Sequence, residues 1–233
     1  MFDAKALLDQ VIGTAEKYAG KENIDKLRET AANNPTLTKV GAIGAAGVLL
    51  STGAGRNILK LGALAGIGGL AYKTYQDWQA NQGKPVEAPE AAREAVKELA
   101  PPPAGTPFDH ATDGQDRALA FLTAMIAAAK ADGEIDKDEQ QRIFGKVSEL
   151  VQDREARAFL MDEMMAPLDI DRIVALAKSP EQAVELYTAS AMAIEIDTPA
   201  EREYLNVLAD RLGLEKGLTG MLETAVADER RSA

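Results

Sequence analysis

The second half of the chain is a succession of helical patterns that begin and end at recognisable capping residues. Ser179–Gln182 and Thr198–Glu201 each place a hydroxyl residue before a proline, with Gln or Glu at the third helical position, which is typical of a helix N-terminus. Gly213 gives a C-terminal stop. Alanine is abundant and aromatic residues are few, which also favours helices. The sequence therefore predicts an all-α domain over residues 113–228.

Apolar residues at helical spacing predict seven helices in this domain, which is enough for one compact core. The expected helices are 114–131, one beginning at Asp136, 154–165, 169–178, one beginning at Pro180, one from Pro199 to Gly213, and 215–228.

Two acidic motifs lie at corresponding places in the domain, each between an Ala/Met-rich apolar helix and an amphipathic one. The first, Ala131–Glu139, has five acidic side chains in nine residues, and the second, Glu195–Glu201, repeats its Glu-Ile-Asp. If the helix pairs pack about a pseudo-twofold axis, the carboxylates converge, and calcium and magnesium prefer such oxygen ligands. The sequence therefore predicts a site for Ca2+ or Mg2+, with candidate ligands Asp132, Glu134, Asp136, Glu139, Glu195, Asp197 and Glu201.

Helix capping is the alternative explanation of the same residues. Asp136–Glu139 and Thr198–Glu201 have the spacing of capping boxes, and an acidic side chain near a helix N-terminus is favourable by ~0.3–1 kcal/mol. Capping accounts less well for the carboxylates that precede these boxes. An EF-hand is excluded, because a loop that starts at Asp132 has Ile143 where a bidentate Glu is required.

Residues 40–72 differ from the rest of the chain because charges almost vanish there. Val40–Gly55 is uncharged over 16 residues and Leu61–Tyr72 over another 12. Small residues recur at the spacing that lets helix backbones touch. Aromatic and basic residues flank the region, as interfacial anchors do. We therefore predict that residues 38–72 associate with membrane lipid, with packing positions at Gly62, Gly66 and Gly69.

Three arrangements of this region remain open, because a spanning helix needs about 20 apolar residues and neither uncharged run reaches that length alone. The first is a single span near 38–56, and the second is a Gly-rich helical hairpin that turns at 51–55. The third is a hairpin buried in a soluble protein, which is disfavoured because each glycine costs about 1 kcal/mol relative to alanine in a helix. Lys and Arg are balanced on the two sides, so no orientation is predicted.

The remaining segments complete a division into four parts. Residues 1–36 predict amphipathic helices, 37–79 the membrane segment or hairpin, 80–112 a linker, and 113–228 the helical domain. The linker contains six prolines, which make an extended and stiff spacer. We expect this spacer to hold the acidic domain away from the membrane.

Composition and charge exclude several kinds of site. The chain has no cysteine and a single histidine, His110, which we interpret as a solvated surface residue. No Ser–His or Cys–His nucleophile can therefore be assembled, and we expect no catalytic residues, no enzymatic activity and no small-molecule substrate. Residues 109–233 carry 14 Lys and Arg against 26 Asp and Glu. This acidic half repels phosphate backbones, so we expect no nucleic acid partner.

The motif Ala129–Glu139, with the later Asp197–Glu201 element, resembles the TerB-like domain of tellurite-resistance proteins. The layout of the whole chain resembles the DUF533 (YebE-like) family, which pairs a Gly/Ala-rich N-terminal region with a C-terminal TerB-like domain. The resemblance implies a seven-helix bundle, placement in the bacterial inner membrane and no settled enzymatic activity. It implies a cation-binding role for Asp132, Glu134, Asp136, Glu139, Asp197 and Glu201.

Two functions follow from these patterns. The leading hypothesis is a membrane-associated, non-enzymatic protein whose acidic domain, on the cytoplasmic side, binds a divalent cation or an unknown protein partner in envelope or metal/tellurite stress. The alternative is a structural protein-interaction module that binds no metal and whose acidic motifs serve only as helix caps.

Overall fold

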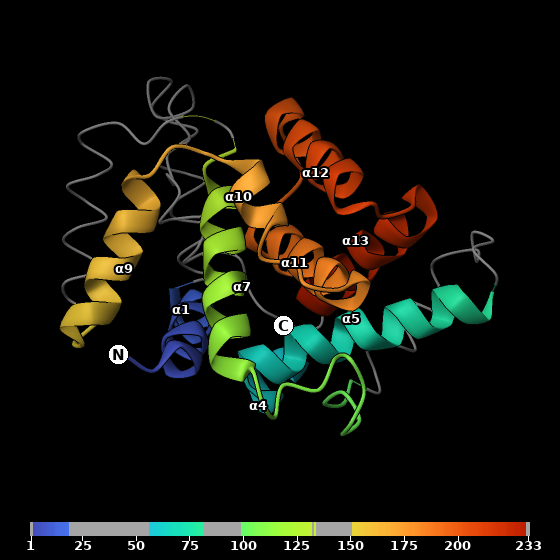
Figure 1. The fold of residues 1–233 in the computed structure, drawn as a ribbon, viewed down its shortest axis with the longest axis horizontal. Coiled ribbons are helices and arrows are strands. Elements are labelled where there is room, and N and C mark those ends of the chain that lie inside the picture. Colours follow the sequence, from blue (N-terminus) through green and yellow to red (C-terminus); the bar gives the residue numbers. More distant parts are fainter. Residues whose placement is uncertain (1, 19–55, 82–98, 132, 134–150, 232–233) are drawn as a thin grey trace.

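A computed structural model describes most of the chain, and every regular element in the described part is a helix (Figure 1). The predicted all-α class is therefore confirmed. The described residues are 2–18, 56–81, 99–131, 133 and 151–231. The helices are α1 (Ala4–Tyr18), α4 (Arg56–Leu61), α5 (Ala63–Ala80), α7 (Gly114–Ala129), α9 (Arg154–Met165), α10 (Ile170–Val174), α11 (Pro180–Ala193), α12 (Pro199–Leu212) and α13 (Lys216–Arg231).

The predicted caps set the helix boundaries in the C-terminal half. The Ser179 side chain accepts a hydrogen bond from the backbone N–H of Gln182. Thr198 and Glu201 form a reciprocal capping box. Gly213 ends α12 in the left-handed conformation at φ 70°, which glycine adopts without strain. The helix expected to begin at Asp136 lies outside the described residues.

The core is organised around α7 and α11, which make the most extensive contact between any two described helices. Figure 1 shows α7 between α9 and α11. Both helices are apolar on most sides. Their largest fully buried side chains are Phe121, Leu122, Met125, Ile126, Leu186 and Tyr187.

The helices of the N-terminal half belong to the same core. α1 packs on α7, and α5 packs on α11 and α13, where Ile58, Ile67 and Leu70 are fully buried. The predicted parts 37–79 and 113–228 therefore share one hydrophobic core over their described residues. In the described part of the chain, no helix combines the length and apolar character needed to cross a membrane. The first uncharged run, 40–55, lies outside that part.

The three glycines predicted to pack in the membrane have neighbours within the protein. Gly62 is the N-cap of α5 at φ 83°. A Cβ added at Gly66 would lie 2.8 Å from Cα of Ile58 in α4. A Cβ added at Gly69 would lie 2.2 Å from the carbonyl oxygen of Ala100. The close backbone approach expected from the small-residue spacing is therefore made to the chain's own α4 and to residue 100.

The second half of the predicted linker packs against α5 rather than extending into solvent. Phe108 is 2% exposed, and its ring centroid lies 5.5 Å from that of Tyr72 and 5.7 Å from that of Tyr75. The linker therefore lies against α5 at Phe108, because these aromatic contacts bury apolar surface of both segments. Residues 82–98 lie outside the described part.

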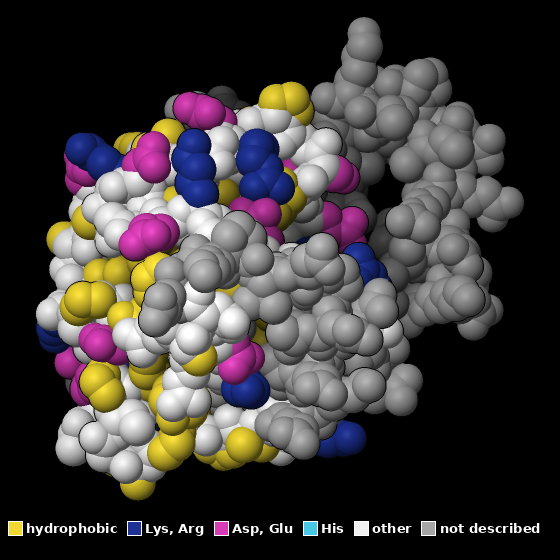
Figure 2. All heavy atoms as spheres, turned by 90° about the vertical axis from the view of Figure 1, so that its right-hand side faces the viewer, with side chains coloured by type: hydrophobic (Ala, Val, Ile, Leu, Met, Phe, Trp, Pro, Cys, Tyr) yellow, Lys and Arg dark blue, Asp and Glu magenta, His cyan; other side chains and the backbone are white. Residues whose placement is uncertain are grey.

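One face of the molecule shows how charged and apolar side chains share the surface. Figure 2 shows Lys and Arg next to Asp and Glu in its upper part, and more hydrophobic side chains in its lower left part. Neighbouring charges of opposite sign limit the local field of the net charge of −11.

Gly66→Ala should lower the free energy of unfolding by ~1–3 kcal/mol, because the added methyl group overpacks against the α4 backbone. Urea or thermal unfolding followed by circular dichroism measures the change. Gly220→Ala is the matched control, since that helical position in α13 has open space around an added Cβ. The control should be neutral or stabilising by ~0.5–1 kcal/mol. Equal effects at both positions would contradict the packing explanation.

Candidate functional site

A buried charged residue, Glu185, lies in the middle of the apolar helix α11 and is 0% exposed. Its Oε2 accepts a hydrogen bond from Arg117 Nη1 of α7, and its Oε1 lies 2.7 Å from His110 Nε2. Burial of an unpaired carboxylate is very unfavourable, so both contacts are needed to keep Glu185 inside. We call Glu185, Arg117, His110 and Asp113 the Glu185 cluster.

Arg117 connects three segments of the chain through its guanidinium group. Nε donates to Asp113 Oδ2 at 2.9 Å, Nη1 donates to Glu185, and Nη2 donates to the carbonyl oxygen of Pro107 at 2.9 Å. Burial would lower the pKa of Arg117, but the charges of Glu185 and Asp113 raise it overall. Arg117 therefore stays protonated and holds residue 107 against α7 and α11.

His110 fits into this cluster because the facing residue of α5 is a glycine. A Cβ added at Gly68 would lie 2.3 Å from His110 Cε1. The His110 side chain is 8% exposed, so its interpretation as a solvated surface residue is wrong. Its Nε2 contacts the buried Glu185, a partner 75 residues away that no local pattern indicates.

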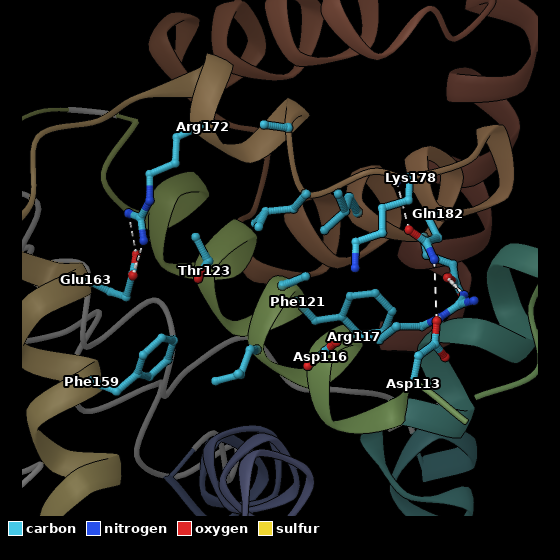
Figure 3. A pocket seen from close by; sticks show the side chains of 16 residues that line it. Asp113, Asp116, Arg117, Phe121, Thr123, Phe159, Glu163, Arg172, Lys178 and Gln182 are labelled. Carbon is cyan, nitrogen blue, oxygen red and sulfur yellow. Dashed lines mark hydrogen bonds and ion pairs between the residues drawn. The ribbon is translucent and has the colours of Figure 1, made fainter. Parts of the chain in front are cut away.

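A groove runs along α7 and ends at the Glu185 cluster (Figure 3). We call it the α7 groove. Its volume is about 350 Å³, and the residues of α9, α10 and the start of α11 form its other walls. Leu119, Ala120, Phe159 and Leu176 make its middle part apolar. The α7 groove is thus an apolar trough with charged groups at both ends.

An ion pair between Glu163 and Arg172 forms the other end of the α7 groove. Arg172 Nη1 donates to Glu163 Oε2 at 2.9 Å, and Nη2 donates to Oε1. This bidentate contact raises the pKa of Arg172. Behind it, Lys130 Nζ donates to the carbonyl oxygens of Glu163 and Ala166 at the C-terminal end of α9, and burial lowers the pKa of Lys130.

The acidic residues predicted to bind a cation are only partly described. Asp132, Glu134, Asp136 and Glu139 lie outside the described residues. Glu195 and Asp197 are exposed, whereas Glu201 is buried.

The Glu201 carboxylate already accepts hydrogen bonds as part of the cap of α12. Its Oε2 accepts from the backbone N–H of Asp197 at 3.2 Å, from the backbone N–H of Thr198 at 3.0 Å and from Thr198 Oγ1 at 2.9 Å. Burial raises the pKa of Glu201, and the hydrogen bonds from Thr198 oppose this rise. Among the described residues, no three Asp, Glu or His side chains are grouped closely enough to hold a metal ion. Helix capping therefore accounts for Thr198 and Glu201, and a cation site shared by both motifs stays a prediction.

Sequence reasoning did not find the Glu185 cluster. One signal was available, since Glu185 interrupts the apolar run of α11 in which ten neighbours from Ala183 to Ala193 are also buried. An acidic residue in such a run requires a buried partner of opposite charge. The sequence does not say which of the 26 Lys and Arg residues provides it.

The fold and this site define an all-helical protein with a buried charge cluster at one end of an apolar groove. The sequence pattern of the DUF533 family, described as proteins of unknown function, matches residues 36–226. The chain therefore belongs to the DUF533 family.

One curated protein is also similar to this chain. It is described as an uncharacterized protein in the ampR 5' region of Yersinia enterocolitica and is 25% identical over 116 residues, which cover 50% of this chain and 84% of that protein. No solved structure matches the chain.

Glu185→Gln should lower the free energy of unfolding by roughly 3–5 kcal/mol, because it leaves the Arg117 cation buried with less compensating charge. The exposed Glu203→Gln in α12 is the control and should change stability by less than about 0.5 kcal/mol. The double variant Arg117→Gln/Glu185→Gln should be less destabilised than the sum of the two single variants. Strict additivity in urea unfolding would contradict a direct coupling.

Proposed function

We propose that this protein is a non-enzymatic interaction module whose α7 groove binds an amphipathic helix of a partner protein. The observation that carries the proposal is the shape and chemistry of the α7 groove. An apolar trough with a few charged groups at its ends is the kind of surface that takes the apolar face of a helix. Partner binding was one of the two roles expected from the acidic domain.

The dimensions of the groove support a helical ligand. Its lining residues on α7 extend from Asp113 to Thr123, which is about 15 Å at 1.5 Å per residue. A helix of about three turns covers this length. The exposed Met165 (52%) and Leu168 (40%) lie in the chain between Glu163 and Arg172.

Charges at the rim give such a ligand a preferred direction. Asp116 and Lys178 both line the groove and are exposed. Neither has an ion-pair partner among the residues that the structure describes. A partner helix with a basic residue near Asp116 and an acidic residue near Lys178 would be favoured over the reverse arrangement.

The pairing of the charged side chains at the two ends of the groove supports binding rather than catalysis. Arg117 and Glu185 neutralise each other, and so do Glu163 and Arg172. A catalytic acid or base needs a group that can exchange a proton with a bound substrate. These four side chains are already used to stabilise the walls of the groove.

Ala120→Arg should block the α7 groove, because a long side chain enters a trough that an alanine now lines. The test is selection of helical peptides from a displayed library against the full chain. We expect amphipathic helices that bind the wild type and lose at least tenfold in affinity for Ala120→Arg, which corresponds to about 1.4 kcal/mol.

Ala200→Arg, at an exposed position of α12, is the matched control and should bind the same peptides as the wild type. Peptides that bind Ala120→Arg as well as the wild type would contradict the groove as the binding site.

The cation-binding function remains the second candidate, with the TerB-like resemblance of residues 113–228 as its support. The exposed Glu195 and Asp197 carboxylates, next to the Glu201 cap, are the described residues that favour it. A role in envelope or metal/tellurite stress and a cytoplasmic position of this domain belong to the same proposal.

The proposal includes association of the protein with the membrane through its first uncharged run, residues 40–55. We expect the full-length protein in the membrane fraction of lysed bacteria, released by detergent but not by high salt, because uncharged segments bind lipid through apolar contacts. Deletion of residues 38–55 should move the protein to the supernatant. Wild-type protein that stays in the supernatant without detergent would overturn this part of the proposal.

A further inference from the structure

Met165 differs from the other methionines of the described chain in its exposure to solvent. It is 52% exposed, whereas Met164, directly before it, is 6% exposed. The remaining methionines in the described part are buried or half-buried: Met125, Met161, Met192 and Met221. A thioether sulfur at the surface is open to soluble oxidants, whereas its neighbours protect one in the core.

The periodicity of α9 places Met165 beside the buried face of the helix rather than on it. That face consists of Ala156, Leu160, Glu163 and Met164, with the spacing of one helical stripe. Each residue of an α-helix is rotated by about 100° from the one before it. Met164 therefore belongs to the core, and Met165 lies outside the stripe.

The backbone around Met165 is held in place by a cation of α7's C-terminal end. Lys130 Nζ donates to the carbonyl oxygen of Glu163 at 3.0 Å and to that of Ala166. Ala166 is extended at ψ 144°, as is favoured for a residue that precedes a proline, so α9 ends at Met165. These contacts fix the last turn of α9, which keeps Met165 at the surface and Met164 inside.

We propose that Met165 is a site of reversible oxidation by peroxide and that the fold protects the adjacent Met164. The sulfur lone pair attacks one oxygen of hydrogen peroxide and the O–O bond breaks. The proton of the attacked oxygen passes to the leaving oxygen, which departs as water. The thioether loses two electrons and becomes a sulfoxide. Two thiols, acting through a methionine sulfoxide reductase, return it to the thioether with formation of a disulfide and water.

The sulfoxide changes the surface of the turn after α9 without requiring a change in the core. It replaces an apolar thioether by a polar group. At Met164 the same polar group would be buried, which is unfavourable without a hydrogen-bond partner. Met165 therefore consumes one peroxide in each cycle while the protein stays folded. This inference concerns a single exposed side chain and does not depend on partner binding in the α7 groove.

Peptide mapping of the full-length protein after graded exposure to hydrogen peroxide tests the proposal. Trypsin cleaves after Arg157 and Arg172, and the peptide between these sites contains both Met164 and Met165, which fragment ions distinguish. We expect Met165 to be oxidised about tenfold faster than Met164 in the folded protein, in line with exposures of 52% and 6%. In urea, where the fold is lost, the two rates should be equal, which provides the control.

Met165→Leu and Met164→Leu form a matched pair of variants, because leucine has nearly the volume of methionine and no sulfur to oxidise. Met165→Leu should remove the fast phase of oxidation, and Met164→Leu should leave it unchanged. Wild-type protein oxidised at Met165 should keep its Tm. Methionine sulfoxide reductases for both epimers, supplied with dithiothreitol, should restore its original mass.

Two results would overturn the proposal. One is an equal rate of oxidation at Met164 and Met165 in the folded protein, because the fold would then protect neither sulfur. The other is a Met165 sulfoxide that unfolds the protein or resists both reductases, because oxidation there would then be damage rather than a reversible modification.

Discussion

The buried ion pair between Glu185 and Arg117 is the interaction on which the arrangement of the core depends. It joins α11 to α7, the two helices with the most extensive contact. Burial of either charge without its partner would destabilise the folded state by several kcal/mol. A shift of one helix along the other would separate the two charges, so the pair favours the observed register of α7 and α11. Through Pro107 and His110 the same pair also draws the 99–112 segment onto the core, and the space for His110 exists only because α5 presents Gly68 there.

Long-range caps explain how helices far apart in the sequence become one unit. In each case a charged side chain of one helix satisfies backbone groups at the end of another, where no intrahelical partner exists. The four caps are Asp9 on Ala63 of α5, Glu229 on Ile58 of α4, Arg230 on the end of α11, and Lys130 on the end of α9. Two of them tie α1 and α13 to α4 and α5, which places the N-terminal half in the same core as the C-terminal half.

Local signals in the sequence were sufficient for the class of fold and for several helix boundaries, because a cap such as Ser179 or Thr198 acts within three residues of itself. The pattern of Leu61–Tyr72 was insufficient, because burial in lipid and burial in a protein core select the same apolar composition. The low helix propensity of its glycines argued against a position in a protein core. This loss of helix stability is offset at Gly66 and Gly69, where the lack of a side chain lets the backbone of another segment pack closely. The partner of Glu185 could not be predicted, since pairing across 68 residues is decided by tertiary packing.

The second acidic motif and the α7 groove are the two candidate binding surfaces. They differ in how many of their polar and charged groups already have partners within the protein. At the second acidic motif, Glu201 accepts three hydrogen bonds within its own cap, and Arg230 donates to the carbonyl oxygen of Ile194, directly before Glu195. These contacts already use oxygen atoms that a cation would otherwise bind. In the α7 groove the charged residues at the two ends are paired, whereas apolar residues and the exposed Asp116 and Lys178 line the rest of the groove. Burial of apolar surface is the main source of free energy for association, and the apolar lining of the α7 groove is the basis of the proposal that a partner helix binds there.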